Sequence, residues 1–374
     1  MSLVIDADGH FMEPFDLWEQ YLEPQYRERA IRLVKDPTTG EETIFVAGKK
    51  SQVMTDPSLL KLTIGAGQLE RMSDPTFTYK DGPPGAYDAH ARVQLMDQQG
   101  IDKALVYPTL GLIWECEVGV EDADLAAAYC RAYNNWIIDH CKPYPQRLFP
   151  IAHISLLDPA AAVTELRRVA KLGVKGVFVS AVPYRGVTYG DPSYVAFWSE
   201  AQEIGIPVGI HPVFHLGFVG HHYYQEPSLW MFITMFSEDV KLCLTTLFND
   251  GFFDLYPRLK IVLVEGMSGW IAQWLERLDH KYLYLNHTLP RPLQLRPSEY
   301  FRRQCWISAD PDEKTLPTMM RLVGEDKFVW GSDFPHAEGY ANPVVELRET
   351  IAELPDSARR KILGENAATL YNLS

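Results

Sequence analysis

Five side chains able to bind a metal ion or transfer a proton stand at the ends of short apolar runs: Asp8, His10, His211, Glu265 and Asp333. Asp8 and His10 are two residues apart, and residues i and i+2 of a strand share one face. Imidazole and carboxylate are the ligands that Zn, Mn and Fe take in proteins. A single strand-end Asp is more often a helix cap, so these residues predict a metal site only if the fold brings them together.

Short apolar runs alternate with amphipathic helical patterns along the chain, and the runs are typical of strands buried on both faces. Helices are expected between them, such as 89–99 and 160–172, the second starting at Asp158-Pro159 and stopping at Gly173. The expected strands are Leu3–Ala7, Ala104–Tyr107, Leu148–Ile154, Val174–Val179, Pro207–His211, Leu259–Glu265, Cys305–Ser308 and Phe328–Ser332.

This order predicts one α/β domain over residues 1–374, a distorted (β/α)₈ TIM barrel whose strand ends meet at one mouth. An open doubly wound sheet is the alternative. That fold expects a glycine-rich phosphate loop after the first strand, where this chain has Asp8-Gly9-His10 and no GxGxxG pattern. Residues 15–88 form an inserted excursion with a hairpin expected around 36–40, and residues 214–225 form a lid-like insertion after the fifth strand.

Three residues are possible ligands of a second ion. Glu13 follows His10 by three residues, His336 follows Asp333 by three, and Glu265 ends the sixth expected strand. Asp8 and Asp333 balance one divalent ion. Glu13 and Glu265 would add two charges whose unpaired burial costs several kcal/mol each. One ion and two ions both remain open on these grounds.

Four residues are candidates for contact with a substrate. His153 ends the third expected strand, and Arg185 follows the fourth, where it could clamp a carboxylate. Phe214 and Trp230 follow the fifth strand and could form an apolar wall. The alternatives are a surface charge for Arg185 and core packing for the aromatic residues.

Composition limits the class of protein. Of 374 residues, 47% are hydrophobic and 22% charged, and 35 basic against 49 acidic residues give a net charge of −14. Such an acidic surface repels phosphate, so nucleic-acid binding is not expected. No apolar run approaches the roughly 20 residues of a membrane span. The N-terminus lacks a signal-peptide pattern and the five cysteines form no CxxC pair, so a cytoplasmic protein is expected.

Six segments, in order along the chain, resemble the amidohydrolase superfamily, and specifically its amidohydrolase-2 branch of aminocarboxymuconate semialdehyde decarboxylase and aromatic-acid decarboxylases. They are Ile5-Asp6-Ala7-Asp8-Gly9-His10 with Glu13-Pro14, then 158–176, 205–212, 256–270, 331–336 and 362–368. The resemblance implies a distorted barrel and a divalent metal, Zn, Mn or Fe. It matches the family ligands to Asp8, His10, His211 and Asp333, and makes Asp333 also the acid–base residue. A homodimer is plausible by the same resemblance.

Two departures from the family pattern bear on the reaction. The first-strand pair is Asp-x-His rather than His-x-His or Glu-x-His, and Glu265-Gly266 stands where the decarboxylases carry a catalytic His. The first hypothesis is a metal-dependent hydrolase or carboxy-lyase acting on a small aromatic or otherwise apolar acid, with Asp333 and Glu265 catalytic. The second is a dinuclear non-heme iron oxygenase, a monooxygenase that needs a reductant and acts on an apolar substrate.

Overall fold

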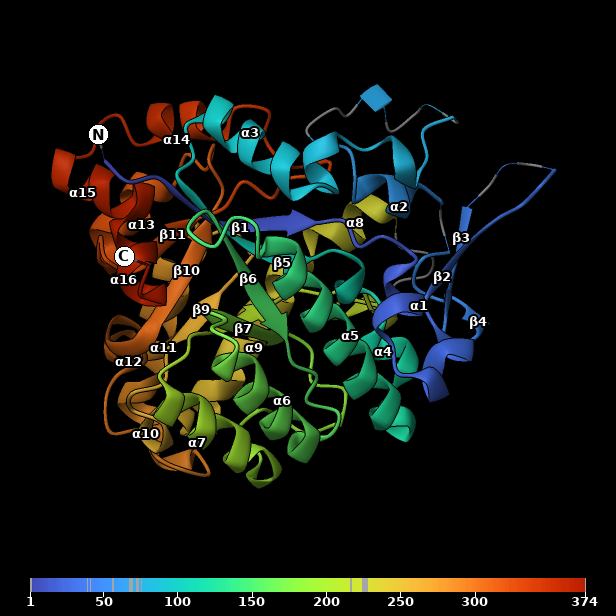
Figure 1. Cartoon of the computed structure of the whole chain (residues 1–374). Helices are drawn as coiled ribbons and strands as arrows, with labels where there is room; N and C mark the ends of the chain where they lie inside the picture. The colour runs from blue at the N-terminus through green and yellow to red at the C-terminus, as the bar shows by residue number, and fades with distance from the viewer. Residues whose placement is uncertain are drawn as a thin grey trace.

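The computed structural model describes residues 2–373 apart from 39, 41, 56, 67–69, 72, 73, 75, 216 and 224–227. Eight parallel strands pair in the order β1-β5-β6-β7-β8-β9-β10-β11, and the last strand returns to the first, where the Asp333 N–H donates to the Asp8 carbonyl. The sheet therefore closes into a barrel, as predicted (Figure 1). Its strands are β1 (Ile5–Phe11), β5 (Lys103–Pro108), β6 (Leu148–His153), β7 (Gly176–Ser180), β8 (Val208–His211), β9 (Ile261–Leu263), β10 (Cys305–Ala309) and β11 (Phe328–Trp330).

Each of the eight expected strands is confirmed, with ends that differ by up to a few residues. β1 continues past Ala7 to Phe11, and β9 stops two residues before Glu265. The barrel interior is filled by buried apolar side chains that alternate along the strands, among them Ile5, Tyr107, Ile151, Phe178 and Val262. Their burial removes apolar surface from water and stabilises the closed sheet.

Helices surround the barrel (Figure 1). The two helices predicted by residue number are confirmed: α3 begins at Ala89 and α6 at Pro159, where the Asp158 side chain accepts from the N–H groups of Ala160 and Ala161. The remaining α-helices are α4 (Glu115–Val118), α5 (Ala123–Cys141), α7 (Val195–Ile204), α8 (Leu229–Thr234), α9 (Phe236–Asn249), α10 (Phe252–Leu255), α11 (Ile271–Leu285), α12 (Pro297–Gln304), α13 (Leu316–Val323), α14 (Pro343–Thr350), α15 (Asp356–Arg360) and α16 (Asn366–Tyr371), with α3 (Ala89–Gln99) and α6 (Pro159–Lys171) as above.

The excursion after β1 contains α1 (Leu17–Tyr21), α2 (Pro57–Leu62) and a small antiparallel sheet beside the barrel (Figure 1). That sheet pairs β2 (Arg32–Lys35) with β3 (Glu42–Val46) and β3 with β4 (Lys49–Lys50). The hairpin predicted around 36–40 is therefore confirmed, although residue 39 lies outside the described residues.

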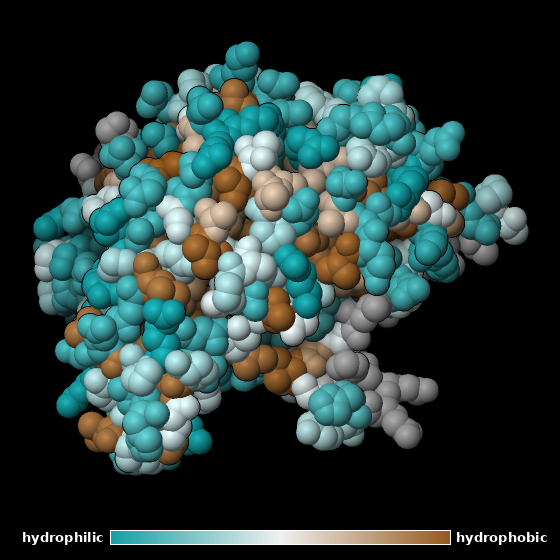
Figure 2. All heavy atoms as spheres, turned by 90° about the horizontal axis from the view of Figure 1, so that it is seen from below, coloured by the Kyte–Doolittle hydropathy of each residue, from teal (hydrophilic) through white to brown (hydrophobic). Residues whose placement is uncertain are grey.

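The expected lid leaves the end of β8 and contains the short helix η8 (His221–Tyr223); its residues 216, 224 and 225 lie outside the described part of the chain. The His215 side chain contacts Asp239 on α9 at 2.9 Å and ties this segment to the barrel. Within the described residues, no helix is long and apolar enough to cross a membrane. The face drawn in Figure 2 is mainly hydrophilic, with hydrophobic residues in separate small groups.

Candidate metal centre

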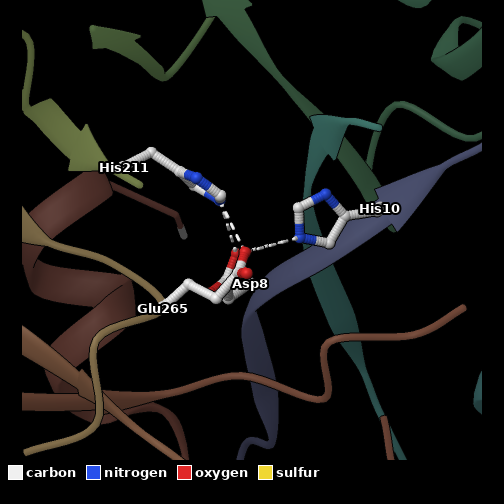
Figure 3. A group of neighbouring side chains, drawn as sticks. All are labelled: Asp8, His10, His211 and Glu265. Atoms are coloured by element: carbon white, nitrogen blue, oxygen red, sulfur yellow. Dashed lines mark ion pairs between the residues drawn. The ribbon is translucent and has the colours of Figure 1, made fainter. Parts of the chain in front are cut away.

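Four of the predicted ligand residues come from three strand ends at the same mouth of the barrel. Asp8 and His10 lie on β1, where the pairing with β5 shifts register between Asp6 and Gly9. His211 is the last residue of β8, and Glu265 lies two residues after β9. Figure 3 shows the side chains of these four residues pointing toward one common centre.

The first group of donor atoms joins Asp8, His10, His211 and Glu265, whose ligand atoms all lie within 4.8 Å of one another. Glu265 Oε2 is 3.1 Å from His211 Nε2 and 3.7 Å from His10 Nε2. Asp8 Oδ1 is 3.5 Å from His10 Nε2 and 3.9 Å from His211 Nε2. Two imidazoles and two carboxylates at such separations are a suitable donor set for a divalent ion.

A second group joins His10, Glu265, Asp333 and His336, again with ligand atoms within 4.8 Å of one another. Asp333 Oδ1 lies 3.5 Å from His10 Nε2 and 2.7 Å from His336 Nδ1. The two groups share His10 and Glu265, so they are adjacent. The structure thus brings together six of the residues that the sequence singled out.

Six buried donor atoms of these two groups have no hydrogen-bond partner. They are Asp8 Oδ1, His10 Nε2, His211 Nε2, Glu265 Oε2 and both carboxylate oxygens of Asp333. The opposite ring nitrogens are held, because His10 Nδ1 contacts the Pro108 carbonyl at 2.7 Å and His211 Nδ1 contacts the Pro212 carbonyl at 2.6 Å. A backbone carbonyl on one ring nitrogen, with the other nitrogen free, is the usual arrangement of a metal-binding histidine.

The electrostatics of the group also call for positive charge. Burial raises the pKa of Asp8 to about 7, and burial together with the charge of Glu265 raises the pKa of Asp333 well above its usual value. Burial lowers the pKa of His10 to about 4. Burial would raise the pKa of Glu265, but the neighbouring imidazoles, led by His211, together outweigh burial and lower that pKa to about 2. Burial thus favours the neutral form of the His10 imidazole, which binds a metal ion, while at His211 burial is outweighed by the carboxylates, which raise its pKa because they favour a positive charge beside them.

Backbone strain aims two of the carboxylates. Glu265 and Asp333 have φ values of 47° and 52°, in the left-handed region that costs a residue with a Cβ roughly 1–3 kcal/mol at such sites. β11 also approaches β1 closely, since a Cβ on Gly331 would lie 2.2 Å from Asp8 Cβ. These features explain why β9 and β11 stop before the residues whose side chains turn into the mouth.

A cavity of about 660 Å³ opens above the donor groups. Phe214 and Trp230 line it together with Leu62, Leu112 and Phe236. The described lining residues include no Lys or Arg. They include five carboxylate residues, which are Asp8, Glu265, Asp310, Asp333 and Glu338. Asp310 and Glu338 were missed in the sequence. Asp310 directly follows the run that forms β10, so the strand-end criterion applied to the other ligands would have found it.

Three predicted site residues lie elsewhere. Glu13 is fully buried, and its carboxylate accepts from backbone N–H groups of residues 109–111 rather than joining either donor group. His153 stacks on Phe178, with ring centroids 4.4 Å apart, and is not among the described cavity residues. Arg185 places its guanidinium 5.6 Å from the centre of the Tyr194 ring, also outside the described lining.

The sequence model of a family described as amidohydrolase matches residues 5–373 of this chain. Among curated proteins, a gamma-resorcylate decarboxylase of Rhodococcus jostii is 28% identical over 293 residues, which cover 75% of this chain and 87% of the relative.

Two solved structures share the fold. An amidohydrolase of Mycobacterium avium subsp. paratuberculosis has a TM-score of 0.83 at 24% identity, covering 99% of both chains. A dihydroxybenzoic acid decarboxylase of Polaromonas, solved with manganese and the inhibitor 2-nitroresorcinol, has a TM-score of 0.65 at 21% identity and covers 100% of this chain and 98% of its own.

Proposed function

The chain belongs to the amidohydrolase family, and we propose that it is a divalent-metal-dependent carboxy-lyase or hydrolase acting on a small carboxylic acid with an aromatic or otherwise apolar body. One observation supports this most directly: unpaired buried ligand atoms converge at the floor of a cavity whose walls are largely apolar. The similarity to a gamma-resorcylate decarboxylase, and to a decarboxylase solved with manganese, supports the same reaction class.

Asp8, His10, His211 and Asp333 would hold the catalytic ion. Their buried atoms lack hydrogen-bond partners, and their chemistry suits Zn, Mn or Fe. When bound, the ion supplies Lewis acidity that polarises the substrate. Among the described lining residues no Lys or Arg is present to bind a substrate carboxylate, so such a group would be oriented toward the donor groups, with the apolar body against Phe214 and Trp230.

Asp333 is the residue we assign to proton transfer. Burial and neighbouring carboxylates raise its pKa in the metal-free chain, so its carboxylate takes up a proton more readily than a solvated aspartate does. In decarboxylation, a proton on an Asp333 oxygen passes to the ring carbon that loses CO₂. In hydrolysis, the Asp333 carboxylate takes a proton from the attacking water and returns it to the leaving group. Glu265, facing the same centre, can supply or accept the second proton.

We further propose that the site takes two ions. Five carboxylate residues line the cavity, and one divalent ion balances only two charges. The second donor group offers its own imidazole, His336 Nδ1, and shares Glu265 with the first. A carboxylate at the position of Glu265 can bridge two ions, whereas the imidazole that the decarboxylase pattern places there cannot bridge through one nitrogen.

The second donor group also favours a second candidate function, a dinuclear iron oxygenase acting on an apolar substrate. With His10 on the first ion, His336, Asp333 and Glu265 remain for a second, and such adjacent sets of imidazole and carboxylate are compatible with paired iron ions. This reaction requires dioxygen and an external reductant, which the lyase and the hydrolase do not.

Three measurements on protein purified without chelator test both candidates. They are its metal content, its visible absorption and its turnover of substituted benzoic acids such as 2,6-dihydroxybenzoate. CO₂ release or hydrolysis without reductant supports the lyase or hydrolase. Two iron ions per chain with turnover only under dioxygen and reductant supports the oxygenase. A chain that holds about one zinc or manganese, unchanged by Glu265→Gln, contradicts the two-ion arrangement. A chain that takes up no divalent ion contradicts every version.

A further inference from the structure

The last residue of β5 and the residue after it contact both histidines of the second donor group. The Pro108 carbonyl lies 2.7 Å from Nδ1 of His10, and the hydroxyl of Thr109, the next residue, lies 3.2 Å from Nε2 of His336. The remaining nitrogens, His10 Nε2 and His336 Nδ1, face Asp333 at 3.5 and 2.7 Å. Two consecutive residues therefore fix the outer edges of both rings.

Glu13 anchors this segment to the start of the excursion after β1. Its Oε2 accepts from the N–H groups of Thr109 and Leu110 at 3.1 and 2.8 Å, and its Oε1 accepts from Gly111 N–H at 2.9 Å. Glu13 and Thr109 are 0% and 1% exposed. A buried carboxylate with three backbone donors holds the Thr109 hydroxyl in one place, which is the requirement for orienting a neighbouring ring.

The Thr109 hydroxyl can accept from Nε2–H or donate to a bare Nε2 of His336, so it allows the tautomer that presents Nδ1 to an ion. A neutral imidazole carries one proton. If Nε2–H donates to the Thr109 hydroxyl, the lone pair of Nδ1 points toward Asp333 and the shared centre. Without that acceptor, the buried Nε2–H would lose its partner, at a cost of about 1–3 kcal/mol. The proton would then favour Nδ1, where Asp333 Oδ1 accepts it, and His336 would no longer offer a lone pair to an ion.

We propose that Thr109 is a positioning residue for the second ion, because its hydroxyl holds the His336 ring and accepts from Nε2–H when Nδ1 gives its lone pair to the ion. This inference rests on the two-ion arrangement proposed above. Glu13 then acts one step further out, as the anchor of Thr109 rather than as a ligand. Loss of an outer hydrogen-bond partner weakens metal binding by about 10–100-fold, and here the loss falls on the second ion alone.

Equilibrium dialysis of the full chain against manganese tests the proposal in Thr109→Val, which keeps the side-chain shape, and in Thr109→Ser, which keeps the hydroxyl. We expect wild type and Thr109→Ser to bind two ions per chain. Thr109→Val is expected to keep the first ion at unchanged affinity and to bind the second about 10–100-fold more weakly. Thermal unfolding monitors folding of each variant, and Thr109→Ala replaces Thr109→Val if the valine side chain prevents folding.

The outcomes separate the two proposals. A wild-type chain that saturates at one ion overturns the two-ion arrangement itself. Two ions of unchanged affinity in folded Thr109→Val, or in folded Thr109→Ala where the valine variant does not fold, overturn the role of Thr109 and leave the two-ion arrangement intact. Loss of the second ion in Thr109→Ser as well would show that side-chain volume, rather than the hydroxyl, matters, and would equally overturn the inference.

Discussion

The mouth of the barrel contains two strand-end histidines in similar settings. His211 ends β8 and His153 ends β6, and both are 0% exposed. Each has Nε2 close to a carboxylate, 3.1 Å from Glu265 for His211 and 3.5 Å from Glu115 for His153. In neither case does Nε2 make a hydrogen bond. By residue type and strand position, the two histidines are equivalent.

Their surroundings differ in the number of strands that contribute. Around His211, donor atoms arrive from β1 and from the segment after β9, and the Pro212 carbonyl at Nδ1 fixes the ring. His153 lies flat against Phe178, both of its nitrogens lack partners, and within the described residues it joins no group of three donors. A strand-end histidine is therefore a metal ligand only where carboxylates from other strands meet it.

The largest expected effect follows from removing the proton-transfer carboxylate. Asp333→Asn is expected to lower kcat by about 10²–10⁴-fold, the usual contribution of a general acid–base residue, with the fold retained. Steady-state kinetics on an acid that wild type converts measure this. Glu115→Gln, which changes the carboxylate beside His153, is the matched control and is expected to change kcat less than about threefold. Wild-type turnover by folded, metal-loaded Asp333→Asn would contradict the assignment.

The fold was largely predictable because its signals are local. Strands buried on both faces are nearly continuous apolar runs, and Asp158-Pro159 and Gly173 mark the ends of α6 by capping chemistry that needs no tertiary contact. Strand bounds at the mouth were less predictable. β9 ends before Glu265 because that residue adopts a left-handed backbone conformation, which residue type alone does not reveal.

The site was predicted most directly where strand position decides side-chain direction. Asp8, His10 and His211 occupy strand positions that face the mouth, and the structure brings them together. Glu13 and Arg185 lie in connecting segments, whose side-chain directions depend on tertiary contacts. Glu13 was placed near the ions by its spacing from His10, but the backbone N–H groups after β5 take its carboxylate instead.

Matched substitutions of His211 and His153 test whether only His211 is a metal ligand. His211→Phe removes a ligand, so we expect manganese affinity to fall by more than the roughly 10–100-fold that loss of an outer hydrogen-bond partner costs. His153→Phe is expected to leave manganese binding unchanged, because a phenyl ring can stack on Phe178 and no third donor lies beside it. Equilibrium dialysis of both variants checks this. Equal losses of affinity would show that His153 and His211 belong to one metal site.

The affinity of the group that contains Asp8 for a metal ion is expected to depend on pH. A ligand must lose its proton before it binds an ion, and burial raises the pKa of Asp8 to about 7 in the metal-free chain. Below pH 7, protons therefore compete, and affinity should fall by about tenfold per pH unit for each proton displaced. Above about pH 7 the contribution of Asp8 should flatten, while the raised pKa values of His211 and Asp333 extend the dependence to higher pH. Manganese titration calorimetry at pH 6, 7 and 8, in buffers of differing ionisation enthalpy, measures the affinity and the protons released. Affinity independent of pH over this range would contradict a protonated Asp8.

The smallest expected effect separates the exposed rim of the cavity from its buried floor. Trp230 is 77% exposed and lines the cavity, while Tyr223 is 78% exposed and is not among the described lining residues. An apolar substrate body that covers the Trp230 ring gains about 25 cal/mol per Å² of apolar surface removed from water. That contact is the same in the ground state and the transition state, so Trp230→Ala should raise KM by up to about tenfold and leave kcat unchanged.

Tyr223→Ala, the matched aromatic control, should change neither constant. Steady-state kinetics on an acid that wild type converts decide the point, because a fall in kcat for Trp230→Ala would place the indole in the reacting geometry and remove the distinction between rim and floor.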